Sequence, residues 1–446
     1  MEDRTARTPD DRGSAMKRAL SYRWAVWGIM TFAFMIVFFH RLAAAVVRED
    51  VTAAFSLSAT DFGQMSSMYF YAYMAMQIPV GLLADSLGAR VTVSVGMLAA
   101  GAGSIIFGLA PSYGWLLAGR FLVGLGVATV FVSIMKIQSQ WFRDGEFATI
   151  SGATSFIGNA GGILSQGPLA FLLTLVSWRA SFVSIGVGTL GIGFLCYLII
   201  RNRPQDIGSP PINEREILRQ DMPPEPFSIA EGIKSVLSVK GVRLAALFYF
   251  FNQAGYFALI GTWGIPWLVN VYGMTVSEAS SLTVMMVVGT MTGGLFNGWI
   301  SDRMGKRRLP MIVMSVFQAL FWGCLVMPWE RAPGAWTLRM LFLLLGFSNA
   351  CFVLSWSVAK EQSSEKYTGL AISILNTAGF LAIAITTSAM GVVIDHYLPA
   401  STEMAYRMAF VIGAVFAVIS LAITFFIPEL KRDAPGGMHD GRSAAA

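Results

Sequence analysis

Charged residues are scarce in this sequence: 13% of its 446 residues are Asp, Glu, Lys or Arg, whereas 55% are hydrophobic. A soluble domain carries about 25% charged residues, so this chain cannot cover itself with a polar surface. Apolar stretches of roughly 18–25 residues recur along its length, each long enough to cross a hydrocarbon layer of about 30 Å. These features predict an all-α integral membrane protein in a lipid bilayer.

Cysteine and histidine are also few, with three residues of each type. The cysteines fall in separate apolar stretches, which argues against a disulfide framework, and no Cys/His spacing typical of zinc occurs. A Walker loop and the G-x-S-x-G elbow of hydrolases are absent as well. We therefore expect no enzyme activity, no metal and no cofactor, and an ion gradient as the energy source. Nucleic-acid binding is not expected either, because no soluble basic domain carries the net charge of +6.

Twelve apolar stretches have the length of a transmembrane helix, six on each side of a polar, proline-rich segment. The predicted spans are 24–47, 61–84, 91–109, 115–138, 147–176, 180–200, 242–267, 277–301, 309–328, 336–358, 369–394 and 404–427. The corresponding domains are an N-terminal tail (1–23), a first six-helix bundle (24–200), a linker (201–241), a second bundle (242–427) and a C-terminal tail (428–446).

Lysine and arginine are distributed unevenly between the loops. The loops on the side of the two termini hold 23 of these residues, and the opposite loops hold 4. Because Lys and Arg favour cytoplasmic loops, this bias predicts that both termini are cytoplasmic. Short loops and the absence of any N-x-[ST] sequon favour a bacterial cytoplasmic membrane.

The two halves contain a repeat with a constant offset of 217 residues. The matched pairs are Gly81/Gly298, Asp85/Asp302, Gly88/Gly305, Arg90/Arg307, Gly152/Gly369, Asn159/Asn376 and Gly162/Gly379. Seven matches in one register are hard to obtain from composition alone, so we interpret the chain as a tandem duplication of six helices.

The repeated loop resembles the hallmark of the major facilitator superfamily, G-x-L-x-D-x-x-G-x-[KR]-[KR], which lies between helices 2 and 3 and is echoed between helices 8 and 9. The matching residues are Asp85, Gly88 and Arg90 in the first copy and Asp302, Arg303, Gly305, Lys306 and Arg307 in the second. The stretch GRFLVGLG at 119–126 resembles a second motif of that superfamily.

This resemblance covers all twelve helices. It implies two pseudo-symmetric six-helix bundles that rock about a central site, with the paired loops as a cytoplasmic gate. Alternatively, the charges of these loops only set the orientation of the helices in the membrane, and the loops form tight turns without acting as a gate. The first copy has Ser86 and Ala89 where basic residues are common in the motif, which predicts fewer salt bridges in the first loop than in the second.

Basic residues outnumber acidic ones inside the predicted spans. No Asp or Glu lies well inside a span, whereas His40, Arg41, Arg120 and Lys136 do. Ionisable groups within a membrane are functional candidates by default, although Lys136 is close enough to a helix end to snorkel. A positive central region favours an anionic or zwitterionic substrate.

The sequence Phe-His-Arg at 39–41 resembles the first helix of organic anion-handling branches of the superfamily, which often have an aromatic, an acid and an arginine there. His40 stands at the place of the acid and is a candidate for the coupling proton; alternatively it packs or bonds to a backbone carbonyl. Arg41 is a candidate anion anchor, or else an ion-pair partner of the acids at 49–50. Arg120 either faces the cavity or bonds to carbonyl groups between helices.

Polar side chains at helical spacing mark further candidate faces. The other candidate substrate residues are Tyr69, Tyr73, Gln77, Asn159, Asn252, Gln253, Tyr256 and Asn376. Each could instead make an interhelical hydrogen bond, worth about 0.6–2 kcal/mol.

The leading hypothesis is a monomeric secondary transporter for a small organic anion or zwitterion, coupled to protons. One alternative is an efflux pump for lipophilic drugs, which the 24 Met and 32 Phe would accommodate in an adaptable pocket. The other alternative is a non-transporting sensor built on a transporter scaffold.

Overall fold

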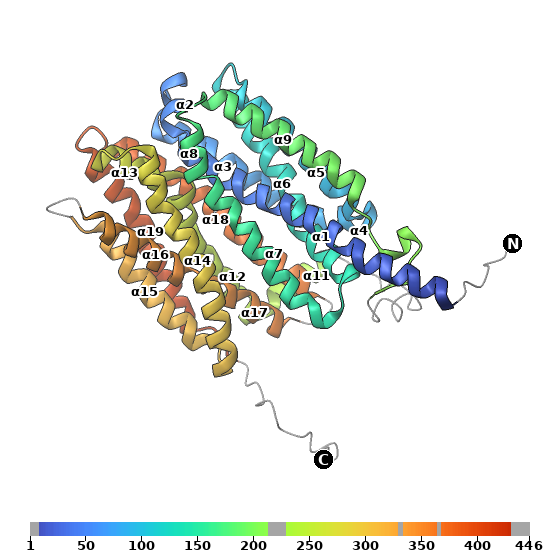
Figure 1. Ribbon diagram of the computed structural model, residues 1–446. Helices are drawn as coiled ribbons and strands as arrows, with labels where there is room; N and C mark the ends of the chain where they lie inside the picture. The colour runs from blue at the N-terminus through green and yellow to red at the C-terminus, as the bar shows by residue number, and fades with distance from the viewer. Residues whose placement is uncertain (1–8, 213–228, 329–332, 364–366, 430–446) are drawn as a thin grey trace, which may run out of the picture.

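The computed structural model describes residues 9–212, 229–328, 333–363 and 367–429. The described residues form helices and no strand, which confirms the predicted all-α class (Figure 1). The first half contains α1 (Pro9–Val46), α2 (Arg48–Phe55), α3 (Ala59–Met76), α4 (Pro79–Ser86), α5 (Gly88–Gly108), α6 (Tyr113–Trp141), α7 (Asp144–Leu164), α8 (Gly167–Leu172) and α9 (Trp178–Ile199).

A connecting segment and the second half follow. They contain η1 (Pro204–Ile207), α11 (Ile229–Ser238), α12 (Lys240–Ala258), η2 (Leu259–Trp263), α13 (Gly264–Tyr272), α14 (Val276–Met304), α15 (Arg308–Val326), α16 (Ala335–Asn349), α17 (Phe352–Gln362), α18 (Thr368–Tyr397) and α19 (Thr402–Thr424). The segment η2 has π-helical geometry. Residues 213–228 of the predicted linker, and parts of both predicted tails, lie outside the described residues.

In the described part of the chain, ten helical segments are long and apolar enough to cross a membrane. The other two predicted spans correspond to α3–α4 and α7–α8, which are interrupted before Pro79 and near Pro168. Proline lacks an N–H and suits the first turn of a helix, so each proline begins a new helix at the break. Together these segments make the twelve spans that the sequence predicts.

The helix α1 begins at Pro9, well before the apolar span predicted from residue 24. Its extension carries Arg23, which forms an ion pair of 2.9 Å with Glu146 near the start of α7. Partial burial alone would raise the pKa of the Glu146 carboxyl, but the backbone N–H of Arg143 and the guanidinium of Arg23 hold that pKa below its ordinary value. A charged helical extension is thus tied to its own half of the molecule.

Small residues allow the helices of each half to pack closely. A Cβ added at Gly103 of α5 would lie 2.8 Å from the carbonyl oxygen of Gly119 on α6, and the reverse addition would meet the same distance. In lipid, where apolar burial drives little association, such close backbone contact stabilises helix pairs. These glycines therefore fix the α5–α6 pair.

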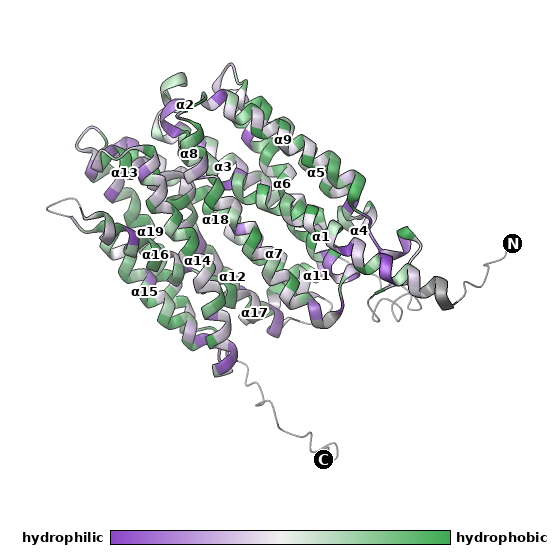
Figure 2. Cartoon of the chain, in the orientation of Figure 1, coloured by the Kyte–Doolittle hydropathy of each residue, from purple (hydrophilic) through white to green (hydrophobic). Residues whose placement is uncertain are grey.

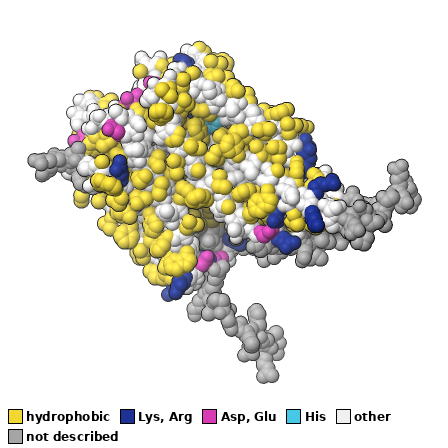
Figure 3. Space-filling model, in the orientation of Figure 1, with side chains coloured by type: hydrophobic (Ala, Val, Ile, Leu, Met, Phe, Trp, Pro, Cys, Tyr) yellow, Lys and Arg dark blue, Asp and Glu magenta, His cyan; other side chains and the backbone are white. Residues whose placement is uncertain are grey.

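The outer surface is apolar in a belt around the middle. Large side chains such as Trp336 and Leu295 are 71% and 69% exposed, far more than a soluble protein tolerates in a continuous surface. Figure 2 shows hydrophobic residues along the middle of the helices and hydrophilic ones toward their ends. In Figure 3, Lys and Arg gather mainly toward the end where the described part of the chain begins and ends, at Pro9 and Glu429. We call this end the termini side and the opposite end the far side.

The two halves are held together at the far side. The carboxylate of Asp395, near the end of α18, accepts hydrogen bonds from the backbone N–H groups of Ala59 (2.9 Å) and Thr60 (2.7 Å) at the start of α3. About two helical turns further along α3 from Thr60, the Ser67 hydroxyl donates to the carbonyl of Ala384 at 2.8 Å. The helices α3 and α18 thus form a closed seam between the halves.

Candidate functional site

Arg41 lies at the centre of the molecule, where both halves meet. Its guanidinium is enclosed by aromatic rings from α1, α3, α12 and α18, and only 7% of the residue is exposed. The guanidinium carbon lies over the rings of Phe38 (4.8 Å to the centroid), Tyr73 (5.3 Å), Phe257 (5.6 Å) and Phe380 (5.3 Å). Aromatic faces attract a cation, so these rings partly replace the water that Arg41 loses on burial.

Among the described residues, Arg41 forms no ion pair with an acidic side chain. The ion pairs that occur there are formed by other residues. The groups that act on it electrostatically are the phenols of Tyr69, Tyr73 and Tyr249. The alternative that Arg41 pairs with an acid at 49–50 is therefore not observed. The described groups that contact Arg41 are therefore neutral, and a second buried guanidinium, that of Arg120, lies over the Tyr69 ring.

Two of the predicted tyrosines on α3 face Arg41 on successive turns. The Tyr69 hydroxyl donates to the carbonyl of Val37 at 3.3 Å, and the Tyr73 ring packs 4.2 Å from the Phe380 ring. Gln77 follows the last residue of α3, and its amide bonds weakly back to the Tyr73 carbonyl at 3.5 Å. The structure therefore brings Tyr69 and Tyr73 to Arg41 and leaves Gln77 at the helix break.

His40 points away from Arg41. Its Nε2 lies 3.1 Å from the Thr189 hydroxyl on α9, and its Nδ1 has no partner in the described part of the chain. Consecutive residues of a helix diverge by about 100°, which explains why the two side chains enter different environments. Arg120 donates to the His40 carbonyl at 3.0 Å, as expected for interhelical packing. Its guanidinium also stacks on Tyr69 at 4.9 Å.

Two predicted amides of α12 belong to a buried network in the second half. Asn252 donates to Gln318 at 2.6 Å, Gln318 donates to Asn349 at 3.1 Å, and Asn349 donates to Gln253 at 3.0 Å. None of the four residues is more than 2% exposed. The network links α12, α15 and α16, so it serves packing between helices in this conformation.

In the described part of the chain, the remaining polar candidates do not form hydrogen bonds with Arg41. The Tyr256 hydroxyl contacts the Met286 carbonyl (3.1 Å) and the Thr290 hydroxyl (2.5 Å), both on α14. Asn159 donates to the carbonyl of Ser155 on its own helix at 2.8 Å. Asn376 is 7% exposed and lies one turn from the Arg41 cluster on α18. Asn376 thus lies close to the Arg41 cluster, whereas Tyr256 directly precedes Phe257 of that cluster but bonds to α14.

The first repeated loop bonds within the first half. Lys136 forms an ion pair of 2.6 Å with Asp85 and donates to the Ala84 carbonyl, so it reaches the loop as a snorkelling lysine would. Arg90 instead donates to the Tyr197 carbonyl at 2.7 Å. Gly88 has φ +81°, a left-handed conformation that favours glycine. These hydrogen bonds and this ion pair, all between described residues, thus join the loop to other parts of the first half in this conformation.

The second repeated loop is more highly connected, as the sequence predicts. Arg307 bonds to Asp302 (2.7 Å) and to Glu361 (2.8 Å), and these hydrogen bonds raise the pKa of Arg307 although burial alone would lower it. Gly305 has φ +61°, which repeats the left-handed turn of the first copy. Arg303 lies over the Trp299 ring at 5.6 Å. The repeat therefore preserves a turn geometry as well as charges.

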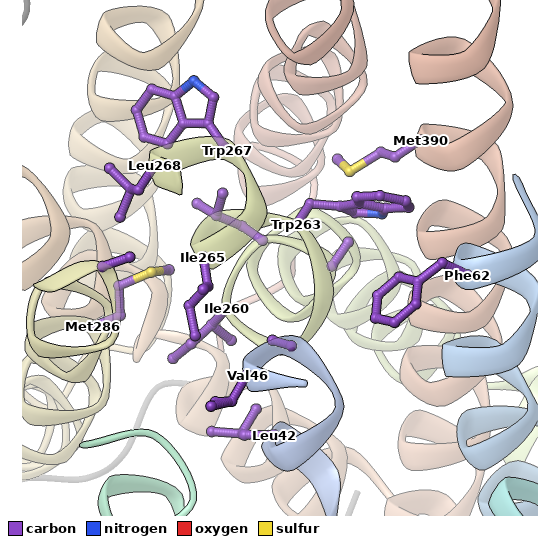
Figure 4. Close-up of a cluster of buried hydrophobic side chains, with 14 of the residues drawn as sticks. Leu42, Val46, Phe62, Ile260, Trp263, Ile265, Trp267, Leu268, Met286 and Met390 are labelled. Atoms are coloured by element: carbon purple, nitrogen blue, oxygen red, sulfur yellow. The ribbon is translucent and has the colours of Figure 1, made fainter. Parts of the chain in front are cut away.

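An apolar cluster closes the far side of the central site (Figure 4). Trp263 of the π-helical segment faces Phe62 of α3, with ring centroids 6.0 Å apart, and donates to the Thr387 carbonyl. Leu42 and Val46 of α1 belong to the same cluster; Leu42 directly follows Arg41, and Val46 lies more than one turn beyond it. Arg41 is therefore screened from the far side by packed side chains of both halves.

Comparisons with known proteins agree with this architecture. The family model of the Major Facilitator Superfamily matches residues 26–264 and again 245–445. The “Probable sulfoacetate transporter” of Cupriavidus necator is 22% identical and covers 94% of this chain and 97% of its own. The “Hexuronate transporter” of Bacillus subtilis is 26% identical, with coverages of 86% and 89%.

A solved structure confirms the fold. The bacterial homologue of the human lysosomal transporter Spinster, in an inward-facing and unoccupied conformation, superposes with a TM-score of 0.74 at 18% identity. The superposition covers 91% of this chain and 97% of that one.

Fold, repeat and relatives together define a multi-pass membrane protein that works as a secondary transporter. The chain belongs to the Major Facilitator Superfamily, and its resemblance to the anion-handling branches is confirmed by the relatives named above. Both relatives are named as transporters, which indicates transport rather than catalysis.

Proposed function

We propose that this protein transports a small organic anion and that Arg41 binds its acidic group. The observation that carries the proposal is a buried arginine, enclosed by side chains of both halves, that has no acidic partner among the described residues. A buried charge without a counter-ion is unfavourable, so an anion from solution would complete the site. The printed names of two relatives, for sulfoacetate and hexuronate, both refer to acidic solutes.

Alternating access provides the transport cycle in this proposal. The bundles 24–200 and 242–427 would rock about Arg41, so that the seam at Asp395 opens when the site faces the far side. The paired loops would close the termini side in that state, acting as the gate that their motif implies. The rings around Arg41 come from both bundles, so substrate binding is coupled to their relative position.

We further propose a monomer in a bacterial cytoplasmic membrane, with both termini cytoplasmic and with a proton accompanying the solute. Moving one negative charge into a cell against an inside-negative potential costs about 2.3 kcal/mol per 100 mV, and a co-transported proton cancels this cost. His40 is the proposed proton carrier because it is buried beside Arg41 in sequence and keeps one ring nitrogen unpaired among the described residues.

Uptake into proteoliposomes tests the proposal. The purified protein would be assayed with an imposed proton gradient and a panel of radiolabelled solutes, namely organic anions, lipophilic cations and neutral sugars. We expect uptake of an anion that Arg41→Gln abolishes, whereas Arg339→Gln, on the outer surface of α16, serves as the matched control.

Other results of this assay would support a different function. Transport of lipophilic compounds alone, unchanged in Arg41→Gln, would support an efflux pump. Anion binding without any uptake would support a sensor. Uptake that equilibrates without a proton gradient would remove proton coupling while leaving the role of Arg41 in place.

A further inference from the structure

The polar groups that converge on Arg41 match a single carboxylate. They are the guanidinium itself and the phenol groups of Tyr73, which bonds to Arg41, and Tyr249, whose oxygen bonds to the Gln253 amide. The Tyr69 hydroxyl also bonds to Arg41, but it donates its hydrogen to a backbone carbonyl. A phenol whose oxygen faces a guanidinium directs its O–H outward and can donate to a ligand. Guanidinium and phenols thus form a set of donors, which suits a ligand group that only accepts hydrogen bonds.

The rest of the wall is aromatic and offers no hydrogen bond. Phe38, Phe257 and Phe380 surround the guanidinium at 4.8–5.6 Å. The aromatic surface continues along α1 and α6 through Phe34, which packs against Phe38 (5.2 Å) and Phe131 (5.6 Å). In the second half, Tyr249 packs against Phe352 (5.8 Å) and Trp356 (6.0 Å). Aromatic groups therefore flank Arg41 on both halves of the molecule.

The amides closest in sequence to these aromatics are largely engaged within the second half, and among the described residues only the Asn252 side-chain oxygen lacks a partner. Asn252 and Gln253 on α12 donate to or accept from Gln318 and Asn349, deep within the second half. A polyhydroxylated anion placed against Phe38, Phe257 and Phe380 would leave hydroxyl groups without partners, which weakens binding. A ligand with an aromatic ring leaves no hydroxyl group without a hydrogen-bond partner there, and it gains edge-to-face or offset contacts with the phenylalanines.

We propose that the preferred solute is an aromatic carboxylate, with its carboxylate on Arg41 and its ring among Phe38, Phe257 and Phe380. This inference rests on the proposed function, because it assumes that Arg41 binds the acidic group of the solute. It separates this protein from the relative named for hexuronates, whose solutes are hydroxylated sugar acids.

Ligand-induced thermal stabilisation of the purified full-length protein measures the preference. Three carboxylates of similar size serve as probes: benzoate, cyclohexanecarboxylate, which has the same outline without an aromatic face, and D-glucuronate, which has hydroxyl groups. The dissociation constant of each is obtained from the concentration dependence of the melting temperature. We expect benzoate to bind at least tenfold more tightly than either of the other two.

The Phe380→Leu variant isolates the aromatic contribution. It should weaken benzoate to the affinity of cyclohexanecarboxylate, because it removes a ring from the wall and keeps an apolar side chain. The matched control Phe194→Leu, at a 59% exposed position on α9, should leave all three affinities unchanged. Phe257→Leu replaces Phe380→Leu if the latter melts well below the wild type.

The outcomes separate the inference from the proposed function. Tighter binding of D-glucuronate, lost in Arg41→Gln, overturns the aromatic preference and leaves anion transport standing. Equal affinity for benzoate and cyclohexanecarboxylate also overturns it. If none of the three carboxylates stabilises a well-folded protein, the role of Arg41 as an anion anchor fails together with the inference.

Discussion

Loss of the Asp395 carboxylate should open the far side of the molecule. Asp395 accepts two backbone hydrogen bonds at 2.9 and 2.7 Å from Ala59 and Thr60, the first residues of α3. The next N–H group of that helix, at Asp61, is satisfied by Ser58 within the same half. The helix N-terminus is thus capped jointly by its own half and by Asp395 of the other half.

The magnitude follows from the type of bond. A hydrogen bond to a charged group contributes about 1.5–3 kcal/mol, and a negative charge at a helix N-terminus adds a few tenths or more. Asp395 is only half-buried, so solvent screening reduces the sum, and we take about 1.5–3 kcal/mol for both bonds together. Asp395→Ala removes this stabilisation from the far-side-closed state alone, because the seam is absent once α3 and α18 separate. Every 1.4 kcal/mol is tenfold, so the closed-to-open ratio should fall by about 10- to 100-fold.

Pulsed electron resonance between spin labels reads this ratio directly. Labels introduced at Leu57 and Leu398 flank the seam, in a background where the three native cysteines are replaced. We expect Asp395→Ala to transfer population from the short to the long distance. The control Glu403→Gln removes a charge from the first turn of α19 and should leave the distribution unchanged. An unchanged distribution in Asp395→Ala would refute the reasoning that this carboxylate holds the seam.

Three further predictions concern other contacts. His40→Gln should flatten the pH dependence of uptake between about pH 5 and 8, and an identical profile would assign the proton to another group. Gly103→Val should lower the melting temperature by the equivalent of about 1–3 kcal/mol, since its side chain would meet the backbone of α6. Because the Glu146 pKa is lowered in the folded state, its pairing with Arg23 stabilises the protein above the ordinary carboxyl pKa of about 4.3. Arg23→Gln should therefore lower the melting temperature at pH 7. This difference should shrink below pH 4.3 and vanish once the pH falls through the lowered pKa of Glu146 in the folded state; a difference that persists at lower pH would contradict it.

The helix pattern was predictable from the sequence because hydropathy acts over a whole span. Each of the twelve apolar stretches corresponds to one helix or to two or three successive helical segments in the structure. The breaks before Pro79 and near Pro168 were not anticipated, since in an apolar run neighbouring helices can also absorb a proline without a break. The repeated glycines at 88 and 305 were recognised from the sequence motif alone. The structure explains why glycine stands there, because both residues have a positive φ.

The central site was only partly predictable. A charge inside an apolar stretch is conspicuous, so Arg41 and its neighbours on α3 were identified. The rings of Phe257 and Phe380 were missed, because a phenylalanine in a membrane helix is ordinary and its partner lies on another helix. The direction of the His40 side chain could not be predicted either, since the sequence does not specify which side of α1 meets α9. Gln318 and Asn349 were missed as single amides on separate helices.

The central claim is that Arg41 binds the negative charge of the solute. The most direct measurement is a calorimetric comparison of a charged ligand and its neutral isostere, benzoate and benzamide, in the wild type and in Arg41→Gln. We predict that the wild type prefers benzoate by at least tenfold and that Arg41→Gln loses this preference while keeping its melting temperature within a few degrees. If the ratio of the two affinities is the same in both proteins, Arg41 does not bind the anionic group and the account is wrong.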